Sequence, residues 1–365
     1  MADCHNLFGD YNSAIKLTEE RRQTLLMARN SLRQRINEGY HGLPNTIKEA
    51  NQLEFHTQGS FIMDTIINPK NEDYDLDEGV YFLGPLSRQV RPATVDFHNF
   101  LIECIQTNQT DIESVKDKET CVRVLYKKGY KTIINDGVET TLGSEFHIDL
   151  PIYYSTIVKS PDLAHKKNGW IVSDPVEFID WFEKKVQSDF RTDFLYETRT
   201  FSQEYTLWQE QIRRADAQLR RIVRYLKAWC DYRDPNRMPC GIIMTILAAN
   251  NFNPSDRDDI SLRDTLVEIK KSLEIEFVCR RPTTPVDEDL FQNSSIEDKE
   301  FFKDSLNAFA TSAIMACNEP KQISSCLKWQ EHLGDRFPCH LAKNEIATTK
   351  SYQSPAIIGE NAKSA

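Results

Sequence analysis

The chain has 365 residues, of which 40% are hydrophobic and 10% aromatic. This composition supports two compact domains or one large one, and it excludes a wholly disordered chain. The 45 Lys and Arg residues are outnumbered by 55 Asp and Glu residues, so the formal net charge is −10. A chain with this charge has no long-range attraction to a polyanion. We therefore expect no duplex nucleic acid as a partner, and any phosphate binding must be local.

Neither a membrane span nor a secretion signal is visible in the sequence. The longest apolar stretch, Gly241 to Ala249, is far shorter than the roughly 20 residues that a membrane span needs. The N-terminal Met-Ala-Asp-Cys-His lacks the basic and apolar regions of a signal peptide. We expect a soluble, cytoplasmic protein with no membrane partner.

The nine cysteines are scattered and include no C-x-x-C pair, which favours reduced thiols in a cytosol. Five cysteines and histidines crowd together near the C-terminal end and could bind zinc. Buried thiols and capping imidazoles on a helical segment are the more common interpretation. The five residues are Cys317, Cys326, His332, Cys339 and His340.

The first predicted element is a long helix. Thr18 is a suitable N-cap, acidic residues follow it, and apolar residues recur at helical spacing from Leu25 to Ile36. The helix should end near Gly39. Residues 1–40 are therefore predicted to form a brace for the rest of the chain.

From about Leu53 to Tyr154 the sequence is rich in short β-type runs separated by turns. Asn135-Asp136-Gly137 is typical of a hairpin turn, and Thr94 to Gln106 has helical spacing of apolar residues. Residues 41–173 should therefore form one domain of mixed α and β structure. The predicted strands are Asp77 to Phe82, Cys121 to Tyr126, Tyr130 to Ile134 and Glu145 to Tyr154.

After Trp170 the pattern is mostly helical. Asp174 is a suitable N-cap, and Pro175 occupies the first helical position. Residues 174–342 are predicted to form a helical lobe, and the polar segment 343–365 a mobile tail. The further predicted helices are Gln209 to Tyr232, Gly241 to Ala249, Ser261 to Leu273 and Glu297 to Cys317. The fold class is thus α+β, with a mixed sheet lobe packed on a C-terminal helical lobe.

The helix Gln209 to Tyr232 combines an apolar stripe with several basic residues. These residues predict either one concentrated cationic face or an ordinary solvated helix. Trp229 on this helix and Tyr81 could stack on bases, although aromatic residues at such spacings more often belong to the core. The basic residues are Arg220, Arg221, Arg224 and Lys227.

Two aspartates stand two residues apart in the predicted strand segment Asp75-Leu76-Asp77. Because residues i and i+2 face the same side of a strand, both carboxylates are directed to one point. Such oxygen ligands suit Mg²⁺, which completes its shell with water and substrate phosphates.

Asp149 lies in another, otherwise apolar strand. If this strand lies beside the first, three carboxylates converge and can hold two metal ions for an in-line displacement at phosphorus. Gly59 and Ser60 precede the acids, where a glycine lets the backbone approach a phosphate and the serine hydroxyl and amides grip it.

Each of these features has an ordinary alternative when taken alone. A Gly-Ser pair is usually a turn, and a D-x-D segment often belongs to a solvated strand face. An acid inside an apolar strand is less common, because burying an unpaired carboxylate is costly. The order and spacing of the three features together favour a catalytic site.

This ordered set resembles the nucleotidyltransferase superfamily that includes DNA polymerase β, oligoadenylate synthetase and animal cyclic GMP-AMP synthase. It is most similar to the bacterial cGAS/DncV-like nucleotidyltransferases, also called CD-NTases. The resemblance covers most of the chain. The matching segments are Gln58-Gly59-Ser60, Tyr74 to Tyr81, Phe146 to Pro151, Leu226 to Trp229, Met238 to Leu247, Arg281 to Leu290, Trp329 and Phe337-Pro338.

The resemblance implies a polymerase-β-like fold with the active site in the cleft between the two lobes. It implies that Asp75, Asp77 and Asp149 are catalytic and hold two Mg²⁺ ions, with Mn²⁺ as an alternative. The nucleotide-binding residues would be Gln58, Gly59, Ser60, Lys227 and Cys240. Relatives often carry a serine where this chain has Cys240, and a thiol is a poorer hydrogen-bond donor than a hydroxyl.

The implied activity is a cyclic oligonucleotide synthase that joins NTPs, ATP and GTP being expected, into a cyclic dinucleotide such as cyclic GMP-AMP. Alternatives are a cyclic trinucleotide synthase, a nucleotidyltransferase acting on an RNA end or a protein, and a nucleotide sensor without catalysis. The resemblance further implies bacterial antiphage signalling. Its partners would be a separate effector and a ubiquitin-like conjugation enzyme acting on the tail that ends in Lys363-Ser364-Ala365, for which an ordinary frayed end is the alternative.

Overall fold

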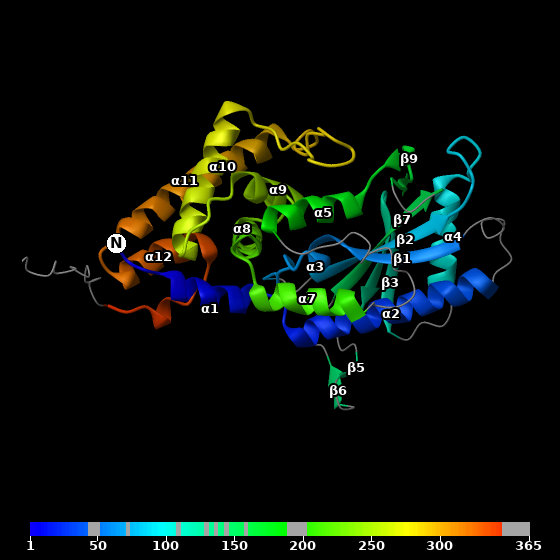
Figure 1. Ribbon diagram of the computed structural model, residues 1–365, viewed down its shortest axis with the longest axis horizontal. Coiled ribbons are helices and arrows are strands. Elements are labelled where there is room, and N and C mark those ends of the chain that lie inside the picture. Colours follow the sequence, from blue (N-terminus) through cyan, green and yellow to red (C-terminus); the bar gives the residue numbers. More distant parts are fainter. Residues whose placement is uncertain are drawn as a thin grey trace, which may run out of the picture.

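A twisted mixed sheet with helices lies beside a mostly helical part in this computed structural model (Figure 1). The structure describes residues 1–42, 52–70, 74–106, 111–127, 131–134, 138–141, 146–156, 160–187 and 203–344. The tail that was considered as a conjugation site falls outside these residues, apart from Lys343 and Asn344.

The strand β7 is the centre of the main sheet. It runs parallel to β2 and antiparallel to β4, and its end also pairs with β8. All ten of its residues are buried. The strand order is β1-β2-β7-β4-β3, with β9 beside β8. The strands are β1 (Gln52–Gln58), β2 (Tyr74–Leu83), β3 (Ile112–Asp117), β4 (Cys121–Tyr126), β7 (Phe146–Ser155), β8 (Asp162–His165) and β9 (Gly169–Val172).

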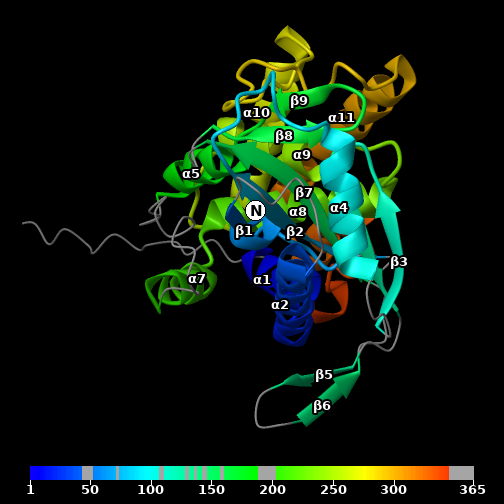
Figure 2. The same ribbon diagram turned by 90° about the vertical axis from the view of Figure 1, so that its right-hand side faces the viewer.

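Two predicted helices pack together along this sheet, α2 (Glu19–Gly42) and α4 (Thr94–Gln106) (Figure 2). The apolar stripe predicted for α2 is buried, including Leu25, Leu32 and Ile36. Burial of this face supplies most of the stability of such a helix. Both helices are confirmed close to their predicted bounds.

The turn predicted at Asn135-Asp136-Gly137 lies outside the described residues. The strands on either side of it, β5 (Lys131–Ile134) and β6 (Val138–Thr141), pair antiparallel with Ile134 opposite Val138. They form a separate two-stranded sheet that projects from the body (Figure 2). The sequence predicted β5 but not β6.

The helical part begins with α5 (Pro175–Val186). The side chain of Asp174 accepts a hydrogen bond from the Glu177 amide, so the predicted N-cap is confirmed. No helix in the described part of the chain is both long and apolar enough to cross a bilayer. The other helices are α7 (Gln203–Ala215), α8 (Gln218–Arg233), α9 (Gly241–Asn251), α10 (Asp258–Ile275), α11 (Ile296–Asn318) and α12 (Gln322–Leu333), followed by the 3₁₀ turn η2 (Cys339–Leu341).

An N-terminal helix that the sequence did not predict, α1 (His5–Ile15), packs on the helical part. Phe8 makes edge-to-face contacts with Tyr225 and Trp329, at centroid distances of 5.1 and 5.0 Å. Helix α1 contacts the helical part, and α2 lies along the sheet. The N-terminal segment therefore connects the two parts of the molecule.

The prediction of one helix from Gln209 to Tyr232 was wrong. The structure has two helices, α7 and α8, with a break at Asp216, whose φ is 41°. The Asp216 carboxylate accepts hydrogen bonds from Arg224 and from Asn12 of α1. These tertiary contacts compensate for the interrupted helix.

The cationic face predicted on this helix was also wrong. Arg220 forms a buried ion pair with Glu183, at 2.5 Å. Arg221 pairs with Asp258, at 2.7 Å, and Arg224 is fully buried. These guanidinium groups bind carboxylates of neighbouring elements, because buried charges must be paired.

The two aromatic residues considered for base stacking belong to the core. This agrees with the alternative interpretation, that aromatic residues at such spacings are core residues. Trp229 is fully buried against Phe309, and Tyr81 stacks on Tyr153 at a centroid distance of 4.6 Å.

Two of the cysteines are not reduced. Cys326 of α12 and Cys339 of η2 form a disulfide, with Cα atoms 5.6 Å apart. This overturns the expectation of reduced thiols at these positions and the zinc hypothesis, because neither sulfur can serve as a thiolate ligand. The Cys317 thiol instead lies 3.8 Å from the Asp259 carbonyl oxygen.

Candidate active site

The turn from β1 into the one-turn helix α3 (Gly59–Ile62) begins at Gly59. Its φ is +68°, a left-handed conformation that favours glycine. A Cβ at this position would lie 2.1 Å from Oδ2 of Asp77. Glycine is therefore required both for the backbone conformation and for the close approach of the carboxylate.

The acids of β2 and β7 meet on one face of the sheet. In the parallel register Asp77 lies opposite Asp149, and Asp75 lies opposite His147. Ligand atoms of Asp75, His147 and Asp149 lie within 4.8 Å of one another. The pairing of strand residues that are 72 positions apart in the sequence, such as Asp77 and Asp149, thus brings the three predicted acids together.

Negative charge at this point is only partly compensated by protein groups. Burial raises the pKa of Asp77 well above its usual range, and repulsion from Asp75 and Asp149 raises it further. Lys227 and Arg123 offset only part of this effect. Because a cation among the carboxylates would favour their charged forms, the donor set fits a divalent metal ion such as Mg²⁺.

Two residues near the acids were not singled out from the sequence. Arg123 on β4 lies opposite Asp149 and donates to both of its carboxylate oxygens, at 2.8 Å each. His147 stands two residues before Asp149, so the period of a strand already places it on the same face. No sequence signal revealed Arg123, because the pairing of β4 with β7 is a tertiary contact.

Lys227 reaches the site from α8. Its ammonium group donates to the hydroxyl and carbonyl oxygens of Thr65, at 3.3 Å each. Burial lowers the pKa of Lys227 to about 8, although Asp75 and Asp77 counteract this shift. A Cβ on Gly241 would lie 3.2 Å from Cε of Lys227, so the start of α9 packs closely on this side chain.

The Gln58 side chain, which the family resemblance assigns to nucleotide binding, contacts two tyrosines of the protein. Its amide group donates to the Tyr153 hydroxyl at 3.1 Å, while its oxygen lies 3.5 Å from the Tyr81 hydroxyl. The side chain therefore fixes the end of β1, immediately before Gly59. Cys240 is exposed and occupies the N-cap position of α9, where its side chain makes no capping hydrogen bond.

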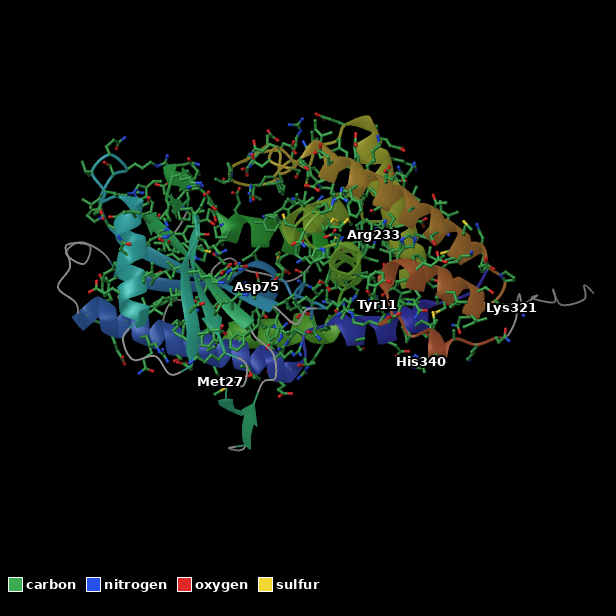
Figure 3. All side chains as sticks on the ribbon, turned by 180° about the vertical axis from the view of Figure 1, so that it is seen from behind. Tyr11, Met27, Asp75, Arg233, Lys321 and His340 are labelled. Carbon is green, nitrogen blue, oxygen red and sulfur yellow. A yellow bond between two sulfur atoms is a disulfide. The ribbon has the colours of Figure 1, made fainter. Side chains whose placement is uncertain are left out.

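A cavity of about 630 Å³ lies between the sheet and the helical part and contains the predicted site residues. Its size falls in the range of about 300–1,000 Å³ that is usual for small-molecule sites. Asp75 lies where the two parts meet (Figure 3). Among the lining residues are Gln58, Gly59, Ser60, Asp75, Asp77, Asp149, Lys227, Cys240 and Arg281.

Comparisons with known proteins agree with this geometry. Residues 53–134 match the family described as cyclic GMP-AMP synthase DncV-like, nucleotidyltransferase domain. A cyclic GMP-AMP synthase of Escherichia albertii is 26% identical over 285 residues, which cover 72% of this chain and 53% of the relative. One of Escherichia coli is 23% identical over 62% of this chain and 53% of the relative. The chain spans about half the length of these curated relatives.

The fold is that of a solved structure of Vibrio cholerae DncV, a cyclic AMP-GMP synthase. The TM-score is 0.65 at 17% identity, covering 92% of this chain and 97% of that one. Another structure of the same enzyme holds the linear intermediate 5′ pppA(3′,5′)pG, with a TM-score of 0.64, 17% identity and coverage of 92% and 97%. By the match of residues 53–134 and by its fold, this chain is similar to the bacterial cGAS/DncV-like nucleotidyltransferases.

Proposed function

We propose that this chain joins nucleoside triphosphates, ATP and GTP, into a cyclic dinucleotide such as cyclic GMP-AMP, with release of pyrophosphate. The observation that carries the proposal is the register of β2 and β7, in which Asp77 lies opposite Asp149 beside the Gly59 turn. The names of the curated relatives and the linear intermediate held by DncV support the choice of product.

Asp75 and Asp77 would hold two Mg²⁺ ions, or Mn²⁺ in their place, and Asp149 would hold one of them. Ligand atoms of Asp75 and Asp149 lie within 4.8 Å of each other, and Asp77 lies opposite Asp149 in the sheet. Bound ions would supply positive charge that stabilises the transition state and lowers the pKa of an acceptor hydroxyl. The fit rests on the three converging carboxylates and on the raised pKa of Asp77. The domain division into residues 1–40, 41–173, 174–342 and 343–365 stays part of this proposal.

In the reaction, a ribose hydroxyl of one nucleotide attacks the α-phosphorus of a bound NTP. A new oxygen–phosphorus bond forms, the bond to the β-phosphate breaks, and pyrophosphate leaves. Asp149 would help to accept the hydroxyl proton.

The donor triphosphate would be held by Ser60, by the backbone at Gly59 and by Lys227. The Lys227 ammonium reaches the cavity from the helical side and is suited to the β- and γ-oxygens as a point charge. Since Cys240 lacks a hydroxyl, backbone amides at the start of α9 would replace the contact that a serine makes in relatives. Most of the catalysis is then positioning and charge stabilisation.

A second round on the linear intermediate, after it turns over in the cavity, would close the ring. We place this synthase in the cytoplasm, where NTPs are available, as the signal source of a bacterial antiphage defence system. Its product would act on a separate effector. Joining of the tail to other proteins by a ubiquitin-like conjugation enzyme stays a prediction, since that tail lies almost wholly outside the described residues.

Incubation with all four NTPs and Mg²⁺, followed by phosphatase and chromatography, tests the activity. A phosphatase-resistant dinucleotide is expected, and a resistant trinucleotide would identify the alternative ring size. Labelled RNA or protein would instead identify a macromolecular acceptor, and unchanged NTPs would overturn the proposal in favour of a sensor. Asp75→Asn and Asp149→Asn should abolish NTP consumption with an unchanged circular dichroism spectrum.

A further inference from the structure

We propose that His147 is a nitrogen ligand of the metal ion held by Asp75 and Asp149, and that this ligand gives the site a preference for Mn²⁺ over Mg²⁺. The inference rests on the proposed function, because it concerns the same metal site. It adds a residue and a metal selectivity that the acid motif alone does not imply.

The register of the sheet places this histidine inside the acidic cluster. His147 lies opposite Asp75 and two residues before Asp149, so all three side chains project from the same face. A ring nitrogen of His147 and a carboxylate oxygen of each aspartate lie within 4.8 Å of one another. Three donors at this separation can surround one ion after small side-chain rotations.

The cavity borders this cluster at its two aspartates. Asp75 and Asp149 line the cavity, whereas the buried His147 is not among the lining residues. The nitrogen donor therefore lies on the protein side of the cluster, and the cavity side remains available for substrate oxygens. This division is typical of catalytic metal sites, which keep positions open for substrate.

Arg123 does not prevent such binding. The guanidinium group takes one lone pair from each oxygen of Asp149, through two hydrogen bonds of 2.8 Å. An ionised carboxylate offers about four lone-pair sites, so each oxygen can still bind a metal. Arg123 fixes the orientation of Asp149 as outer hydrogen bonds commonly do for metal-binding carboxylates.

The donor set determines the expected selectivity. Carboxylates alone suit Mg²⁺, which is a hard ion and prefers oxygen. Imidazole nitrogen is a better ligand for transition metals, and Mn²⁺ accepts mixed nitrogen and oxygen donors. A site with one imidazole should thus bind Mn²⁺ more tightly than Mg²⁺, and removing the imidazole should weaken Mn²⁺ more than Mg²⁺.

The test is electron spin echo envelope modulation of Mn²⁺ bound to the whole 365-residue chain in a nitrogen-free buffer. A ¹⁴N coupling is expected for the wild type and should disappear in His147→Gln. In titrations, His147→Gln should weaken Mn²⁺ binding about tenfold and Mg²⁺ binding less than about threefold. His340→Gln is the matched control, because this exposed histidine lies in the helical part, away from Asp75 (Figure 3).

The outcomes separate this inference from the proposed function. Two results would overturn the assignment of His147 as a ligand: bound Mn²⁺ without a ¹⁴N coupling, or a coupling that persists in a folded His147→Gln variant. If NTP consumption continues in either case, the proposed function stands. Failure of the wild type to bind Mn²⁺, together with unchanged NTPs, would overturn both. Thermal unfolding and circular dichroism of each variant identify any loss of folding.

Discussion

Arg123 on β4 donates hydrogen bonds to both carboxylate oxygens of Asp149 on β7, at 2.8 Å each. The pair lies in one row across the sheet, with Asp77 on the next strand. The guanidinium group thus neutralises part of an acidic cluster and orients one of its members.

Replacing Arg123 with Gln should lower the free energy of unfolding by about 2 kcal/mol without metal, since a hydrogen-bonded charge pair is lost and the carboxylates repel more strongly. Mg²⁺ should recover most of this loss, because an ion among the carboxylates replaces the missing charge. Urea unfolding with and without Mg²⁺ measures both effects. Arg88→Gln, which breaks a pair with Asp162, is the control. An equal deficit in both conditions would contradict the assignment of the cluster as a metal site.

Gly59→Ala should abolish most of the activity. The new methyl group would lie 2.1 Å from Oδ2 of Asp77, so that carboxylate must move. Displacement of a catalytic group by about 1 Å commonly costs about a hundredfold in rate. The expected result is at least such a loss of kcat, measured as pyrophosphate release.

Gly169→Ala is the matched control for this change. Gly169 has nearly the same φ, +70°, but no atom lies within 4 Å of the added Cβ. Both variants should lose about 1–2 kcal/mol of stability from the left-handed backbone. Only Gly59→Ala should lose activity; equal loss in both would show that the contact with Asp77 is unimportant.

Asp64 should contribute to stability at neutral pH and lose this contribution in acid. Burial alone would raise its pKa, but Arg22, Arg224 and Lys16 outweigh that effect and hold the pKa of Asp64 below its usual value. The closest pair, with Arg22, is 2.5 Å long. Since the folded-state pKa is depressed, the stabilisation is present above the unfolded value of about 4 and is lost as the pH falls through the folded value.

Asp64→Asn should therefore cost about 3–5 kcal/mol at pH 7, because three cations lose their buried partner. Its unfolding free energy should also fall less steeply below about pH 4 than that of the wild type. Urea unfolding from pH 3 to pH 7 measures both, with the exposed Asp10→Asn as the control. Parallel pH profiles for Asp64→Asn and the wild type would refute the role of the carboxylate.

Cys240 should react with iodoacetamide before the other thiols. All nine cysteines lie in the described part of the chain, and Cys240 is the exposed one among the seven free thiols. Burial raises the pKa of Cys4 to about 11 and that of Cys121 to about 12, which suppresses their thiolates. Peptide mass spectrometry should locate the first adduct at Cys240, and a bound NTP should slow its formation. Unchanged labelling at saturating NTP would place the nucleotide elsewhere.

Local sequence signals predicted most individual elements. The bounds of α4 and β4 agree with the predicted ranges, and Asp174 caps α5 as expected. Such features depend on periodicity and on capping residues within a few positions of the chain. The ordered acids were predictable for a related reason, since strand alternation places Asp75 and Asp77 on one side wherever the strand lies.

Features that join distant segments were not predictable in this way. The break at Asp216 depends on hydrogen-bond partners from α1 and α8. The burial and pairing of the arginines on α8 depend on carboxylates of other elements. The disulfide joins Cys326 to Cys339 because the chain folds back after α12.

The sequence by itself determined the fold class, most of the helices and which three acids we propose for the site, because these follow from short-range patterns and a family resemblance. Only the tertiary structure decided that β4 brings Arg123 to Asp149, and that β2 and β7 pair in a register that sets His147 beside Asp75. Pairing between strands is fixed by the burial of the whole sheet, and a shift of one residue would turn these side chains to the opposite face.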